Sequence, residues 1–143
     1  MPRIIRYMTI LLTLSFAAAA SAAETSDAKL RNLLLGAWTI DRDHPGNDVE
    51  REAVRLRIFG ITQYESDGRG ATSIYTEKLC GRLVRQHTFR WDVKDGILTA
   101  SDGTTTSKDR ILSVSKTKAV LVSVDGNNDA KEFRLRIGEA ACR

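Results

Sequence analysis

The chain has 143 residues, of which 28% are charged and 42% hydrophobic, and its formal net charge is +4. This length is typical of one ordinary domain, and the composition excludes a collagen-like, coiled-coil or intrinsically disordered chain. Without Arg3 and Arg6 of the N-terminal segment the net charge is only +2, which is too small to favour a nucleic-acid-binding protein, since such a protein requires a concentrated basic patch.

The first 23 residues have the organisation of a signal peptide. Arg3 and Arg6 supply a positive segment, residues 8–20 are an apolar run, and small residues follow. This pattern predicts a periplasmic or secreted protein with one mature domain, residues 24–143. An N-terminal membrane anchor is the alternative. The apolar run is shorter than the about 20 residues of a spanning helix, so no stable membrane span is expected after leader removal.

Both cysteines, Cys80 and Cys142, lie in the mature part. An even number of cysteines in an oxidising compartment predicts a disulfide, and here only one intramolecular pairing exists. The alternative is two free thiols. A catalytic dithiol is disfavoured because the chain has no Cys-x-x-Cys spacing.

A short helix is predicted from Ser26, a capping residue, to Leu35, with Gly36 ending it. Period-two alternation and apolar runs then predict strands almost to the end of the chain. The predicted strands cover residues 37–41, 54–58, 61–66, 71–77, 82–93, 97–100, 106–114, 119–124 and 133–137.

The predicted strands are joined by tight turns, including Asp-Gly pairs at 67–68, 95–96 and 102–103. Consecutive short strands without an intervening helical period indicate an all-β fold. We expect a small antiparallel up-and-down β-barrel of about eight strands, because closure removes exposed sheet edges. A Greek-key sandwich is the competing topology.

The order of a leader, a leucine-bearing helix, Gly36-Ala37-Trp38 and a meander resembles the lipocalin-like (calycin) group, especially its small bacterial members of unknown function. The resemblance implies that Trp38 plugs one end of the barrel. It also implies that an arginine of the last strand, Arg134 or Arg136, packs on that tryptophan. A disulfide between Cys80 and Cys142 would be similar to the one found in many lipocalins. The chain is shorter than a full lipocalin, so small, simplified barrels are the better comparison.

One face of the predicted strand 82–93 carries the candidate ligand-binding residues. Leu83, Arg85, His87, Phe89, Trp91 and Val93 alternate along it, and the candidates among them are Arg85, His87, Phe89 and Trp91. If that face points inward, the two polar side chains can orient an anionic ligand at the barrel mouth. The alternative is that the strand bends and leaves Arg85 and His87 on the rim or in solvent.

Other clusters of polar residues favour simpler interpretations. Asp41, Asp43, His44 and Asp48 lie in one loop, and their spacing fits a solvated turn better than a metal site. Residues 125–129 carry no closing glutamate of a calcium loop and are predicted to form a hairpin turn. Arginines alternate with aliphatic residues on the strands 54–58 and 133–137, which predicts outward, solvated stripes of Arg55, Arg57, Arg134 and Arg136, with a polyanion-binding face as the alternative.

No nucleophile elbow, catalytic triad or zinc-binding histidine pair is present in the sequence, so no enzymatic activity and no cofactor are expected. The leading hypothesis is an exported protein that holds a small, partly apolar or amphipathic ligand in the barrel. The second is an envelope protein that acts through protein contacts, as a protease or lysozyme inhibitor or an assembly factor, using residues 24–29 or 42–48. A structural or stress-related envelope protein is the third.

Overall fold

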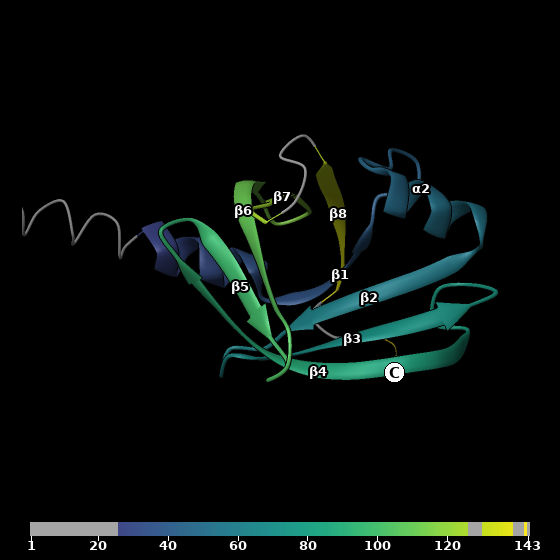
Figure 1. Cartoon of the computed structure of the whole chain (residues 1–143), viewed down its shortest axis with the longest axis horizontal. Helices are drawn as coiled ribbons and strands as arrows, with labels where there is room; N and C mark the ends of the chain where they lie inside the picture. Colours follow the sequence, from purple (N-terminus) through teal and green to yellow (C-terminus); the bar gives the residue numbers. More distant parts are fainter. Residues whose placement is uncertain (1–25, 126–129, 139–141, 143) are drawn as a thin grey trace, which may run out of the picture.

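The computed structural model describes residues 26–125, 130–138 and 142 (Figure 1). The predicted leader and most of the predicted turn at 125–129 lie outside these residues. In the described part, eight antiparallel strands close into one barrel, with each strand paired to its neighbours in sequence and the last paired to the first. The predicted all-β barrel is therefore confirmed, and consecutive pairing excludes the Greek-key alternative. The strands are β1 (Gly36–Ile40), β2 (Ile58–Tyr64), β3 (Arg69–Thr76), β4 (Arg82–Lys94), β5 (Ile97–Ser101), β6 (Thr106–Val114), β7 (Lys118–Ser123) and β8 (Lys131–Gly138).

The N-terminal helix, residues 26–34, lies across one end of the barrel, on the left in Figure 1. The Asp27 carboxylate accepts hydrogen bonds from the backbone amides of Asp95 and Gly96, at 2.7 and 3.0 Å. Arg31 pairs with Asp92 at the end of β4. These contacts attach the helix to the turn between β4 and β5. The predicted helix is confirmed, and we call the end that it covers the closed end.

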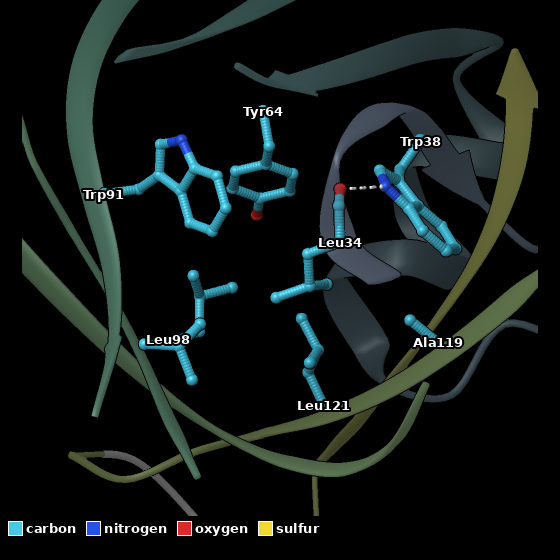
Figure 2. Close-up of a cluster of buried hydrophobic side chains, with 8 residues drawn as sticks. Leu34, Trp38, Tyr64, Trp91, Leu98, Ala119 and Leu121 are labelled. Atoms are coloured by element: carbon cyan, nitrogen blue, oxygen red, sulfur yellow. Dashed lines mark hydrogen bonds between the residues drawn. The ribbon is translucent and has the colours of Figure 1, made fainter. Parts of the chain in front are cut away.

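The core lies inside the barrel, directly under this helix, as Figure 2 shows. Leu34 points from the helix into the space between the strands and is 1% exposed. Burying these large apolar side chains supplies most of the stabilisation that the domain requires. The cluster comprises Leu34, Trp38, Tyr64, Trp91, Val93, Leu98, Ala119 and Leu121.

A second helix, α2 (Asp48–Arg55), includes the first two residues of the strand predicted over residues 54–58, a turn follows at 56–57, and only Ile58 belongs to a strand, so that prediction is wrong. The helix begins because the Asn47 side chain caps it, accepting a hydrogen bond from Glu50 N at 2.9 Å. The helix ends at Arg55 with Leu56 as its C-cap, and Arg57, whose left-handed φ is 55°, turns the chain into β2. The alternation that predicted a strand therefore spans a helix end and a strand start. The predicted outward stripe of Arg55 and Arg57 does not exist.

The face predicted for the long strand β4 is correct only from Arg85 onward. Ile74 pairs with Arg85 but Tyr75 pairs with Leu83, so Val84 is an extra residue in the ladder. Such a bulge switches the side chains beyond it to the other face. Leu83 therefore lies on the outer side, away from the predicted row.

A smaller apolar cluster covers the outside of β1, β2 and β3. Ala37, Ile61 and Tyr75 are buried there, and Cys142 packs against them. Cys142 forms a disulfide with Cys80, in the turn between β3 and β4, with the two Cα atoms 5.5 Å apart. The predicted disulfide is thus present. No helix among the described residues is long and apolar enough to cross a membrane.

Candidate ligand-binding cavity

A cavity of about 310 Å³ lies inside the barrel, at the end opposite the N-terminal helix. Hairpin turns of an up-and-down barrel alternate between its two ends. The turn between β4 and β5 is at the closed end, so the turn between β5 and β6, which borders the cavity, is at the other, open end. The cavity is lined by Thr62, Tyr64, Thr72, His87, Phe89, Leu98, Ala100, Asp102, Thr105, Thr106, Ser107, Asp109 and Arg134.

The apolar wall of the cavity is built around Phe89. Its ring lies over Gly70 on the neighbouring strand, where a Cβ atom would be 2.3 Å from Phe89 Cε2. The absence of a side chain at Gly70 therefore permits this ring position. The ring of Tyr64 meets Phe89 edge-on, with centroids 5.9 Å apart, and Leu98 and Ala100 continue the wall.

Arg134 projects from β8 into the barrel, where its side chain is only 17% exposed. Its guanidinium donates hydrogen bonds to the Tyr64 hydroxyl at 2.8 Å and to Glu132 Oε2 at 2.7 Å. Burial raises the pKa of the Tyr64 hydroxyl, so this group stays neutral at physiological pH. Arg134 therefore joins a phenol and a carboxylate across the barrel interior.

Asp109, on β6, also lines the cavity and is half-buried. Burial raises the pKa of its carboxyl, the negative charges of Glu132 and Asp125 raise it further, and Arg134 opposes them. The Asp109 carboxylate makes no hydrogen bond or ion pair with another residue in the described part of the chain. The cavity thus contains a carboxylate for which the described residues provide no direct partner.

The structure places the four candidate ligand-binding residues in different environments. His87 and Phe89 line the cavity, with His87 exposed and its ring 6.3 Å from Phe89. Arg85 is exposed and does not line the cavity. Trp91 is buried in the core, where its Nε1 donates to the carbonyls of Glu65 and Arg69. Only His87 and Phe89 are therefore positioned to touch a molecule in the cavity.

The predicted outward stripe on the last strand is also wrong. Arg134 and Arg136 both contact interior side chains, and Arg136 lies over Trp38 with 4.9 Å between its Cζ and the ring centroid. The apolar residues that alternate with them lie on the outside. One of these, Phe133, is covered there by the loop that contains Gly46.

The cavity residues that the sequence did not indicate include Tyr64 and Asp109, and it did not indicate Glu132, which bonds to Arg134. Each is one polar residue within a strand, and a lone polar residue does not reveal which face it occupies. The only signal was that Asp109 and Ile111 are two positions apart, which places them on one face. The register of the closed barrel is needed to place that face inside.

A second cleft, of about 480 Å³, lies between α2 and the barrel and shares Thr62 and Arg134 with the cavity. Glu50 lines it and is buried, and its Oε2 accepts from Gly46 N at 2.6 Å. Burial raises the pKa of the Glu50 carboxyl, and the charge of Glu132 adds to that effect.

The acidic loop before α2 is held by protein groups. Asp41 Oδ2 lies 3.4 Å from both His44 Nδ1 and Lys118 Nζ. No group of three or more His, Cys, Asp or Glu residues in the described chain is arranged to hold a metal ion. Asp48 lies in α2 and not in a turn.

The architecture is consistent with a calycin-like barrel, since a short helix covers one end and an arginine of the last strand lies on the Gly-x-Trp tryptophan. The chain was compared with protein-family models, with curated proteins and with solved structures, and it matches none of them.

Proposed function

We propose that the protein is an exported binding protein that holds a small, partly apolar ligand in the barrel cavity. One observation carries this proposal: the barrel is filled at its closed end but has a cavity of about 310 Å³ at its open end. Small-molecule sites are typically concave, apolar and equipped with a few polar groups that orient the ligand. The wall of Phe89, Leu98 and Ala100, beside Tyr64 and Arg134, has this composition.

Export is supported by two independent features. The N-terminal sequence has the charge and apolar pattern of a secretory leader. Cys80 and Cys142 form a disulfide, and disulfides persist mainly in oxidising compartments.

Native mass spectrometry of protein purified from the periplasm tests the binding function. We expect an added mass that disappears on denaturation. The variant Ala100→Phe, which fills the cavity, should lose this mass. Thr99→Phe is the matched control, because Thr99 neighbours Ala100 on β5 and does not line the cavity. A bare protein in every case, with no small molecule taken up from a periplasmic extract, would reject the proposal.

A second candidate function, contact with an envelope protein, is favoured by the start of β4. Leu83 and Val84 are 51% and 59% exposed there, next to the disulfide-bonded turn. The segments expected to serve as inhibitory loops are less suited, since Asp27 is bonded to the barrel and Gly46 packs on Phe133. The test is to purify wild-type protein and the variant Leu83→Asp from the periplasm and to compare the proteins that co-purify with each. A partner bound at the start of β4 should be lost from the variant. Recovery of the same proteins with both would reject it.

A further inference from the structure

The charges inside the open end of the barrel do not balance. Among the described side chains, β8 contributes Glu132 and Arg134, and β6 contributes Asp109. Arg136 is at the closed end, over Trp38, and His87 lies on the exposed rim. Two carboxylates therefore share one guanidinium in the interior, leaving one negative charge in excess. Asp102, which also lines the cavity, is exposed in the turn before β6, where its carboxylate accepts hydrogen bonds from Thr104 and Thr105.

Arg134 is poorly suited to bind an anionic ligand. Its two terminal nitrogens already donate to Tyr64 and Glu132. A ligand carboxylate would have to approach Glu132 and Asp109, which are both negative and both influence Arg134 electrostatically. Like charges brought together in a partly buried site repel strongly, because water screens them less there than at the surface. The geometry disfavours the anionic ligand that an arginine and a histidine on β4 would have suited.

Asp109 has the opposite character. Its carboxylate lines the cavity, is half-buried and lacks a direct partner among the described residues. Removing a charge from water without pairing it is costly, and its raised pKa reflects that cost. A cation beside it would remove the imbalance. A neutral ligand would leave the imbalance in place.

We propose that the cavity binds a protonated amine attached to a small apolar body, with the ammonium group beside Asp109 and the apolar body against Phe89 and Leu98. This inference rests on the proposed binding function and names the chemical class of its ligand. The size of the cavity limits that ligand. A volume of about 310 Å³ is at the small end of the range for small-molecule sites, which suits a small aromatic or alkyl amine.

The experiment is an amide chemical-shift titration of the mature, disulfide-bonded protein at neutral pH. The probes are benzylamine, 2-phenylethylamine and hexylamine, each compared with the alcohol and the carboxylate that carry the same apolar body. We expect the amines to shift residues around the cavity and to bind about tenfold more tightly than the alcohols, as one charged hydrogen bond provides. The carboxylates should bind most weakly.

The variant Asp109→Asn should reduce amine affinity about tenfold and leave alcohol affinity nearly unchanged. Asp95→Asn removes the same charge from an exposed turn at the closed end and should change neither. The comparison of amine affinity with alcohol affinity in wild-type protein tests the inference even if a variant does not fold.

The outcomes distinguish a failure of the amine preference from a failure of the proposed binding function. Alcohols or carboxylates that bind as tightly as the amines, or an unchanged amine affinity in Asp109→Asn, would overturn the amine preference and leave the cavity a binding site. If no probe shifts the cavity residues, the amine inference fails. If the native mass spectrum also shows no ligand, the binding function fails with it.

Discussion

The guanidinium of Arg136 lies over the Trp38 ring at the closed end of the barrel, with its Cζ 4.9 Å from the ring centroid. The same group donates a hydrogen bond to the Leu33 carbonyl at 2.7 Å. Trp38 in turn donates from Nε1 to the Leu34 carbonyl, also at 2.7 Å (Figure 2). These two side chains, from the first and last strands, thus satisfy backbone carbonyls at the C-terminal end of the N-terminal helix. The two strands that close the barrel are therefore also the strands that hold the N-terminal helix in place.

Replacing Trp38 with alanine should therefore destabilise the domain strongly. The indole is 1% exposed, and a truncation of this size leaves a cavity, so we expect a loss of about 3–5 kcal/mol in the free energy of unfolding. Urea denaturation of residues 24–143 measures it. Trp38→Phe should cost less, because it retains most of the packing and loses the hydrogen bond to Leu34. A loss below about 1 kcal/mol for the alanine variant would contradict a plugging role.

Arg136→Ala should destabilise the protein by about 1–3 kcal/mol, because the Leu33 carbonyl loses its donor and the indole loses its cation. Arg110→Ala is the control, since Arg110 is exposed on β6. It should stay within about 0.5 kcal/mol of wild type. Equal effects of the two substitutions in urea denaturation would show that the stacked arginine is not structural.

The barrel itself was predictable because its signals are local. Asp-Gly turns and period-two alternation predict strands without reference to the rest of the chain, and consecutive strands pair in order. The helix α2 shows the limit of this reasoning. The cap at Asn47 and the acidic first turn are also local signals, but the alternation around Val54 competed with them. The structure resolves this competition in favour of the cap, which satisfies backbone donors directly.

The site was less predictable, because it depends on which way each strand faces. Alternation in β8 shows that Arg134 and Arg136 share a face, but hydrophobicity alone assigns that face to solvent. Here the interior is partly polar, and the loop containing Gly46 covers the outer apolar residue Phe133. The bulge at Val84 likewise leaves no trace in the sequence, although it determines where Leu83 points.

Removing the disulfide should destabilise the domain by about 4 kcal/mol, since the bond closes a loop with a sequence separation of 62 residues. We propose the double variant Cys80→Ser, Cys142→Ser, compared with wild type by urea denaturation with and without a reductant. The reductant should lower the stability of wild type and leave the variant unchanged. A wild-type protein that is insensitive to reductant would show that the two cysteines are not bonded in solution.

Asp109 should make stability depend on pH. Its folded-state pKa is raised above the unfolded value of 3.8, so protonation favours the folded state. The stability contributed is full below the unfolded pKa and is lost as pH rises through the raised folded pKa. Asp109→Asn should accordingly be more stable than wild type at pH 7, and this advantage should diminish as the pH falls through the raised folded pKa towards the unfolded value of 3.8. Urea midpoints across that range measure the effect, and an Asp109→Asn variant less stable than wild type at pH 7 would contradict it.

Arg134 should act as a structural partner of Tyr64 and Glu132. In Arg134→Met, the Tyr64 hydroxyl and the Glu132 carboxylate each lose a hydrogen bond that Arg134 donates to them in a partly buried setting. We therefore expect the free energy of unfolding to fall by about 1–3 kcal/mol. In the double variant Arg134→Met, Glu132→Gln, the carboxylate that would lack a partner is also gone, so the combined loss should be smaller than the sum by about 0.5–3 kcal/mol. Arg110→Met serves as the exposed control. Strictly additive losses would mean that the pair is not coupled, which would leave Arg134 available to bind an anionic ligand and weaken the case for an amine.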